Sequence, residues 1–131
     1  MTFCVDTDVM VDCLRAVPQA RAWLEGITSD SFVVPGIVAM ELVVGCANQE
    51  ELKRTQNFLR TFRVIWPEAH EFARAYELLA RHRLSSGLSI PDCLVAAMAL
   101  NRALSLYTFN QKHYRMVEGL GVQEPYQRAQ K

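Results

Sequence analysis

Short runs of apolar and β-branched residues recur along the chain, and most of them end at residues that break an extended strand. The run at residues 31–34 is Ser-Phe-Val-Val, and Pro35 and Gly36 follow it. Runs of this length, bounded by turn residues, predict strands that are largely buried. The pattern predicts strands over residues 2–5, 31–34, 63–66 and 104–108, and a last edge strand at Gly121-Val122.

Between these strands, apolar residues recur at the three- and four-residue spacing of a helix. Val9, Met10, Cys13 and Leu14 follow this spacing directly after the first predicted strand. Pro18 suits the start of a second helix, because proline is tolerated where no helical amide bond is lost. The pattern predicts helices over residues 7–14, 19–25, 37–46, 49–61, 67–84 and 90–103, and a short helical turn near residues 112–117.

Strands that alternate with helices predict a parallel sheet with helices on both faces. At 131 residues, the chain has the length of one domain. We therefore expect a single domain over residues 1–131, an α/β fold built as a three-layer α/β/α sandwich with a mainly parallel central sheet. In the longest predicted helix, the candidates for the packed face are Phe72, Tyr76, Leu79 and Ala80.

The balance of charge limits how the protein could bind nucleic acid. Fourteen Lys and Arg residues match fourteen Asp and Glu residues, so the formal net charge is zero. A protein that binds phosphates mainly through bulk charge is distinctly basic. Any nucleic acid must be bound by a local patch, or through metal ions that bridge acidic side chains to phosphate. Half of the residues are hydrophobic, which excludes a disordered chain.

The first residues and the cysteines predict a cytoplasmic protein. Residues 1–5 carry no basic segment followed by a longer apolar one, which a secretory signal would require. No apolar stretch approaches the ~18 residues of a membrane span. The cysteines, scattered without a C-x-x-C pair, are expected to be reduced and mostly buried: Cys4, Cys13, Cys46 and Cys93.

Three acidic residues begin predicted helices and have plain structural explanations. Asp6 closes the first predicted strand, where a side chain caps the following helix. Asp8 lies in the first turn of that helix, where a carboxylate suits the helix dipole. Asp92 follows Ser89 at the spacing of a capping box.

Glu41 is harder to explain, because it is the only charged residue among residues 37–46. Its helical neighbours include Ile37, Val38 and Val44. A carboxylate on so apolar a helix must reach solvent, find a partner or bind a cation, since an unpaired buried charge is very costly.

Taken together, these acids predict a metal site. Asp6 and Asp92 lie at predicted helix starts, Glu41 lies one turn into the helix that follows a strand, and Asn110 follows the strand that ends at Thr108. An Asx turn is the plain explanation for Asn110, but a parallel sheet collects such residues at its carboxyl edge. Clustered carboxylates repel one another unless a cation neutralises them. Oxygen ligands without His or Cys suit Mg²⁺ or Mn²⁺, and one or two such ions would assist phosphodiester hydrolysis.

Four blocks of the chain, in this order, carry a resemblance. They are VDTDVMVDCL from residue 5, PGIVAMELVVG from residue 35, GLSIPDCLVAA from residue 87 and LYTFNQKHY from residue 106. Each block is weak alone, but together they resemble the PIN-domain ribonucleases, and most closely the VapC-type toxins of bacterial toxin–antitoxin pairs. The resemblance extends from Phe3 to about Pro125.

The resemblance implies a Mg²⁺-dependent endoribonuclease, for which Mn²⁺ can substitute. It also implies a homodimer that a cognate VapB-like antitoxin holds inactive. Thr108 would orient the site or the phosphate, and Asn110 stands where relatives carry Asp or Asn, which leaves the number of metal ions open. The residues that match the family's metal ligands are Asp6, Glu41, Asp92 and Asn110.

Two other functions stay open at this stage. Asp6-x-Asp8 after a strand is also found in HAD-type phosphatases, but no later lysine and acidic run of that family follow, and Glu41 would be unexplained. A catalytically silent domain that binds only RNA or protein is the non-enzymatic alternative. It is less consistent with three acids in the family positions.

Other polar and aromatic residues have a mainly structural interpretation. His113 fits a structural role in the family pattern, and His70 and His82 are expected on the surface. Lys112, Arg115 and residues 81–83 are candidates for a phosphate-facing patch, although solvated surface charge is the simpler explanation. The candidates for an antitoxin groove or a dimer contact, which helical spacing places more readily in the core, are Trp23, Phe58 and Phe62.

Overall fold

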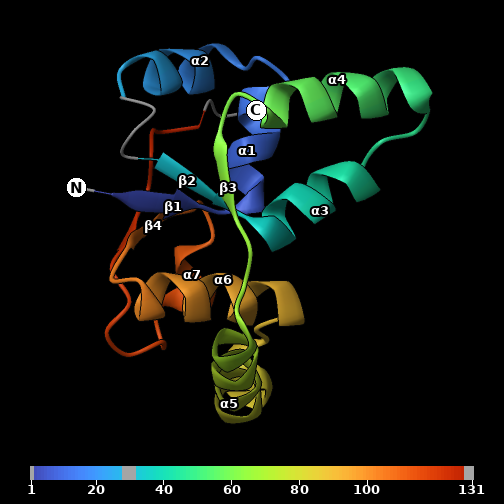
Figure 1. Ribbon diagram of the computed structural model, residues 1–131. Helices are drawn as coiled ribbons and strands as arrows, with labels where there is room; N and C mark the ends of the chain where they lie inside the picture. The colour runs from blue at the N-terminus through green and yellow to red at the C-terminus, as the bar shows by residue number, and fades with distance from the viewer. Residues whose placement is uncertain (1, 28–31, 129–131) are drawn as a thin grey trace.

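A computed structural model of the chain describes residues 2–27 and 32–128. Its centre is a five-stranded sheet in which every neighbouring pair is parallel (Figure 1). The strand order is β3-β2-β1-β4-β5, so the first strand lies in the middle. The strands are β1 (Phe3–Val5), β2 (Phe32–Pro35), β3 (Arg63–Ile65), β4 (Ser105–Tyr107) and β5 (Val122–Gln123).

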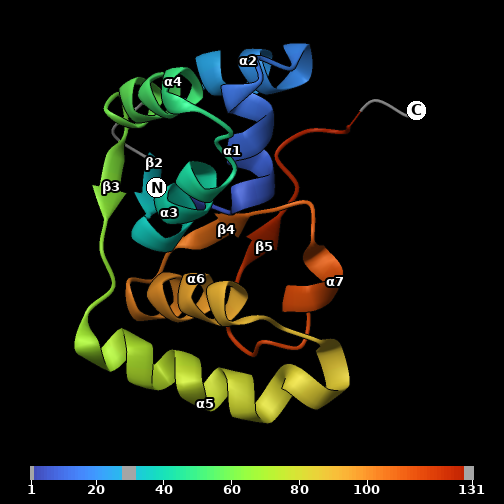
Figure 2. The same ribbon diagram turned by 90° about the vertical axis from the view of Figure 1, so that its right-hand side faces the viewer.

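Helices cover both faces of this sheet. Figure 1 and Figure 2 show α1, α2 and α4 on one side and α5, α6 and α7 on the other. The helix α3 continues from the end of β2 and contacts both α1 and α6. The helices are α1 (Thr7–Leu14), α2 (Pro18–Glu25), α3 (Gly36–Val44), α4 (Gln49–Leu59), α5 (Ala69–Ser86), α6 (Ile90–Asn101) and α7 (Gln111–Tyr114).

This arrangement confirms the predicted three-layer α/β/α fold with a parallel sheet. The predicted elements are all present, and their bounds differ from the observed ones by a few residues. Ser31, the first residue of the second predicted strand, lies outside the described residues. Capping residues define two of the boundaries, because the Asn48 side chain accepts a hydrogen bond from the Glu51 amide at 2.8 Å, and Ser89 forms the predicted capping box with Asp92.

The core lies on both faces of β1 and β2 and along α6. Cys4 and Val5 of β1 are buried, and so is the run from Cys93 to Ala99 on α6. The predicted buried thiols are confirmed for Cys4, Cys13 and Cys93, and no disulfide joins cysteines in the described part of the chain. No helix within residues 2–27 and 32–128 combines the length and apolarity needed to cross a bilayer.

The packed face predicted for α5 is wrong. Phe72, Tyr76 and Ala80 are exposed, and Leu79 is only half-buried. The buried positions are Glu71, Ala75 and His82, which lie on the side of α5 that packs along α6. The prediction that His82 is a surface residue is therefore also wrong.

The prediction for α5 is wrong because its buried face includes a charged residue, Glu71, whose carboxylate is fully hydrogen-bonded. Glu71 accepts hydrogen bonds from the Arg102 side chain at 2.9 and 3.0 Å and from the Asn101 side chain at 2.9 Å. Burial alone would raise the pKa of Glu71, but bonds from Arg102, the Glu68 amide and Asn101 lower it below its ordinary value. A charged residue can therefore occupy the interface between α5 and α6.

Candidate active site

The sheet brings the predicted site residues to its carboxyl edge. Asp6 directly follows β1, and Thr108 and Asn110 follow β4, which is the parallel neighbour of β1. Glu41 lies on α3 after β2, and Asp92 lies in the first turn of α6. The elements that carry these residues therefore end or begin at the same edge of the molecule.

Asp6 caps α1 and also contacts the end of β4. Its Oδ1 accepts a hydrogen bond from the Thr7 amide at 2.9 Å. Its Oδ2 accepts a hydrogen bond from the Thr108 hydroxyl at 2.8 Å, across 102 residues of sequence. The side chain is only 7% exposed. Asp6 therefore caps α1, as expected, and these hydrogen bonds fix its carboxylate at the edge of the sheet.

Asp6 is held in surroundings that disfavour its charge. Burial raises its pKa to about 7, and the negative charges of Asp8 and Asp92 add to this effect, while hydrogen bonds from Thr108 and Thr7 oppose it. A carboxyl group with such a pKa gains most from a nearby cation. The position thus has the electrostatic character that the clustered acids predicted.

Besides lying in the first turn of α1, Asp8 contacts the segment that follows β4. Its Oδ2 accepts a hydrogen bond from the Phe109 amide at 3.0 Å and lies 3.4 Å from the Thr108 hydroxyl. Its Oδ1 is buried and has no hydrogen-bond partner among the described residues. Burial raises the pKa of Asp8. Asp8 is therefore a further, half-buried acid of the same cluster.

Glu41 has a partner from the neighbouring helix. Its Oε1 accepts a hydrogen bond from the Thr7 hydroxyl at 2.6 Å, and the side chain is half-buried. Thr7 thus joins the acid on α3 to the start of α1, next to Asp6. This contact of Thr7 was not predictable, since no local pattern signals a contact over 34 residues.

Asp92 is held from two directions. Its Oδ2 accepts a hydrogen bond from the Ser89 amide at 3.1 Å, within the capping box of α6. Its Oδ1 accepts a hydrogen bond from the Tyr114 hydroxyl of α7 at 3.2 Å. Burial, followed by the charges of Asp6 and Asp92, strongly raises the pKa of Tyr114, so its hydroxyl stays a donor. Tyr114 was not among the residues predicted for the site.

Asn110 and His113 complete the set of contacts. The Asn110 amide donates to the Thr108 hydroxyl oxygen at 3.0 Å. The Asn110 Nδ2 lies 2.9 Å from His113 Nδ1, which lies 3.8 Å from Asp92 Oδ2. One unbroken series of contacts therefore runs through Glu41, Thr7, Asp6, Thr108, Asn110, His113, Asp92 and Tyr114.

The carboxylates approach one another without closing into a ready metal-binding group. Within residues 2–27 and 32–128, no three His, Cys, Asp or Glu side chains are arranged to hold an ion. Like charges disfavour such a group, and a divalent cation removes that repulsion. The oxygen donors are those that Mg²⁺ and Mn²⁺ prefer.

The candidate basic patches differ in their surroundings. Lys112 and Arg115 are exposed on and just after α7, beside the acid cluster. In the predicted patch at residues 81–83, His82 is buried, and Arg83 donates to the carbonyl groups of Gly87 and Leu88 at the end of α5. Of these candidates, Lys112 and Arg115 are the ones on the segment that carries Asn110 and His113.

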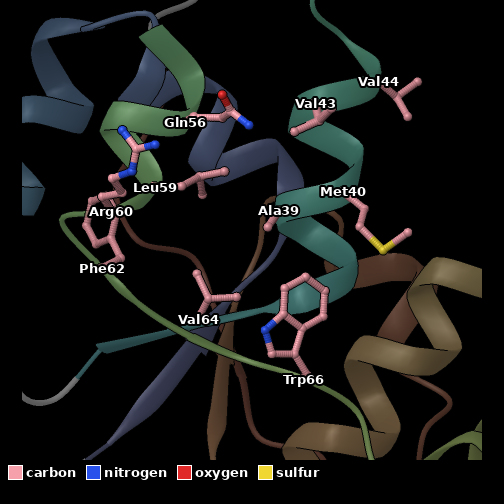
Figure 3. Close-up of a pocket in the computed structure, with 10 residues that line it drawn as sticks. All are labelled: Ala39, Met40, Val43, Val44, Gln56, Leu59, Arg60, Phe62, Val64 and Trp66. Carbon is pink, nitrogen blue, oxygen red and sulfur yellow. The ribbon is translucent and has the colours of Figure 1, made fainter. Parts of the chain in front are cut away.

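The three aromatic candidates divide between the core and a groove. Trp23 packs in an aromatic cluster with Phe3 and Tyr107, as the core interpretation predicted. Phe58 stacks edge-on against Phe62, which lines an apolar groove of about 590 Å³ between α3, α4 and β3 (Figure 3). Figure 3 also labels Ala39, Met40, Val43, Val44, Gln56, Leu59, Arg60, Val64 and Trp66 along this groove.

Comparison with known proteins identifies relatives of the whole chain. The PIN domain family matches residues 3–119. Ribonuclease VapC10 of Mycobacterium tuberculosis is 33% identical over 118 residues, which is 88% of each chain. Ribonuclease VapC19 of the same organism is 32% identical over 127 residues, which is 93% of this chain and 98% of the relative.

Solved structures agree with this relationship. A chain of a toxin–antitoxin complex from Klebsiella pneumoniae superposes with a TM-score of 0.78 at 27% identity, covering 97% of this chain and 100% of that chain. A chain of DNA-bound VapBC from Salmonella typhimurium has a TM-score of 0.79 at 19% identity, covering 96% and 99%, and shares the fold. The protein described here thus belongs to the PIN-domain family, among its VapC-type ribonucleases.

Proposed function

We propose that the chain is a Mg²⁺-dependent endoribonuclease of the cytoplasm that hydrolyses RNA phosphodiester bonds at the carboxyl edge of its sheet. The observation that carries this proposal is the unbroken series of contacts that joins Asp6, Glu41, Asp92 and Asn110 through Thr7, Thr108 and His113. The ribonuclease names of its relatives support the reaction class.

Two features of the donor set fit a divalent cation. The acids offer hard oxygen ligands, and burial together with neighbouring charge raises the pKa of Asp6, which a cation would reverse. Asp8 adds a buried oxygen that has no hydrogen-bond partner among the described residues. We assign Asp6 and Asp92 as direct ligands of Mg²⁺ or Mn²⁺, and Glu41 and Asn110 as direct or water-mediated ligands.

The side chains around these ligands have separate tasks. When bound, the cation supplies activation of water and offsets negative charge on the phosphodiester. Thr108 holds Asp6 Oδ2, and Thr7 holds Glu41 Oε1, so a hydroxyl orients each of these two ligands. Lys112 and Arg115 supply positive charge for the phosphates that flank the cleaved bond. This local patch reconciles RNA binding with a net charge of zero.

The first test is cleavage of a quenched fluorescent RNA by the purified protein, in Mg²⁺ or in EDTA. We expect cleavage by the wild type in Mg²⁺, and a fall to the EDTA level for Asp6→Asn and Asp92→Asn. Glu50→Gln, the same acid-to-amide change at an exposed position of α4, controls for preparation and should cleave as the wild type does. Full cleavage by Asp6→Asn would refute the assignment.

A protein that cleaves only one particular RNA would give no signal in this assay, so Mn²⁺ binding by calorimetry accompanies it. The proposed nuclease binds Mn²⁺, and Asp6→Asn weakens that binding. A silent RNA- or protein-binding domain would bind Mn²⁺ no better than Asp6→Asn does. A phosphatase would hydrolyse small phosphate esters, which the proposed nuclease leaves intact.

We also propose a VapB-like antitoxin as the regulating partner, because the similar chain from Klebsiella pneumoniae comes from a toxin–antitoxin complex. Inhibition of RNA cleavage by the bound antitoxin is the expected regulation.

A second copy of the chain is the partner that we propose for one apolar face. This face includes the exposed Met40, Val44 and Trp66 along the groove between α3 and β3, and the exposed Tyr76 and Ile90 along a second apolar pocket between α5 and α6. The groove in Figure 3 opens on this face, and α3, α6 and α5 lie toward the viewer in Figure 2. Exposed apolar patches mark interaction sites, and an apolar patch is complementary to itself, as a two-fold dimer requires.

A further inference from the structure

Tyr114 contacts the acid cluster from an element that supplies none of its carboxylates. Its side chain is completely buried at the end of α7, and its hydroxyl donates to Asp92 Oδ1 at 3.2 Å. Among the described residues, this hydroxyl is the only hydrogen-bond partner of that oxygen. The other oxygen, Oδ2, is bound by the Ser89 amide of its own helix. The two oxygens of Asp92 are therefore fixed from two different elements.

The hydroxyl is not needed to fill space. A phenylalanine would occupy the same buried site, and it would avoid the cost of removing a hydroxyl from water. That cost is offset here by a hydrogen bond to a carboxylate, which is stronger than one between neutral groups. The benefit of the hydroxyl thus lies in the direction that it imposes on Asp92.

The direction matters because the capping box alone leaves the carboxylate incompletely defined. The bond from Ser89 turns Oδ2 toward the start of α6. Tyr114 then sets the rotation of Oδ1 from the segment that follows β4, which also carries Thr108 and Asn110. A single segment therefore orients Asp6 through Thr108 and Asp92 through Tyr114.

We propose that Tyr114 is a positioning residue, whose hydroxyl holds Asp92 Oδ1 in the orientation that binds a divalent cation together with Asp6. The inference rests on the proposed metal-dependent function and adds a residue that touches neither the cation nor the RNA. Groups that orient metal ligands contribute to affinity, and their loss weakens binding by about 10-fold or more.

The test compares Tyr114→Phe with Tyr126→Phe. Tyr126 donates its hydroxyl to a carboxylate as well, Asp12 Oδ2 at 2.8 Å, outside the acid cluster. The two variants therefore lose the same kind of bond. Mn²⁺ is titrated into each protein by calorimetry, and thermal unfolding in EDTA is recorded alongside. RNA cleavage is measured over a range of Mg²⁺ concentrations.

We expect Tyr114→Phe to raise the Kd for Mn²⁺ by about 10-fold, and the Mg²⁺ concentration at half-maximal cleavage by a similar factor. Tyr126→Phe should leave both unchanged, and Tyr114→Phe should remain folded in EDTA, unfolding slightly below the wild-type temperature because one hydrogen bond to a carboxylate is lost. Equal Mn²⁺ affinity in wild type and Tyr114→Phe would overturn the role of Tyr114 and leave the proposed function standing. Failure of the wild type to bind Mn²⁺ would overturn both.

Discussion

Asp6 combines a structural task with an electrostatic cost. It caps α1 and accepts a hydrogen bond from Thr108, and these bonds hold its side chain in a buried position. Burial and neighbouring acids raise its pKa to about 7. The folded protein consequently binds a proton at Asp6 between about pH 4 and pH 7, where the unfolded chain has already released it.

This difference predicts a pH-dependent loss of stability. In EDTA, the free energy of unfolding of the wild type should fall relative to Asp6→Asn as the pH rises from about 4 to about 7, by about 2–4 kcal/mol in total. Asparagine keeps the helix cap and carries no charge. Urea unfolding of both proteins at several pH values measures the difference. A constant difference across this range would show that the Asp6 carboxyl is not destabilised.

The positions of individual candidate residues were predictable where local rules apply. Asp6, Asp92 and Asn110 follow strand ends or begin helices, and the sequence pattern predicts those boundaries. Thr7 and Tyr114 were not predictable, because each acts on a residue in a separate element. Their contacts span 34 and 22 residues, and no periodic pattern encodes them.

At the scale of elements, the contact between α5 and α6 depends on a buried acid. Glu71 is fully buried, and its Oε1 also accepts a hydrogen bond from the Glu68 amide at 2.8 Å, which caps α5. Arg102 extends the contact to the Trp66 carbonyl, before the start of α5. One side chain thus fixes both the beginning of α5 and its position against α6. A pattern of apolar spacing does not reveal such a face.

Removing this acid should destabilise the whole fold. Glu71→Ala leaves the Arg102 guanidinium without its partner, and we expect a loss of about 3 kcal/mol in the free energy of unfolding. Glu77→Ala, at an exposed position of the same helix, should change it by less than about 0.5 kcal/mol. Urea denaturation followed by circular dichroism measures both. Equal effects of the two variants would exclude a special role for Glu71.

At the scale of the whole molecule, alternation of strands and helices sufficed to predict the three-layer fold. The carboxyl edge followed from the same rule, and so did the region of the site. The strand order, with β1 between β2 and β4, was not predictable, since it depends on which crossover packs over which strand. The exposed apolar face on α3 and α5 was likewise not recognised, because helical spacing alone assigns such residues to the core.

The proposed dimer gives this face a testable consequence. Val44 is 83% exposed on α3, and Val44→Asp places a charge where a second copy would bury it. We expect the wild type to sediment as a dimer and Val44→Asp as a monomer in analytical ultracentrifugation. Leu84→Asp, at an exposed apolar residue of α5 that lines neither this groove nor the pocket beside Tyr76 and Ile90, is the control and should remain dimeric. A monomeric wild type would refute the proposed contact.

The central place of β1 also has a consequence for synthesis of the protein on the ribosome. β1 is made before its neighbour β4, and the hydroxyl of Thr108 follows Asp6 about a hundred residues later. A growing chain therefore carries Asp6 without the strand that completes its surroundings. A chain released before β4 would expose an unpaired strand edge, which promotes aggregation. Under the proposed function, a nascent chain therefore stays inactive until β4 and Thr108 have been made.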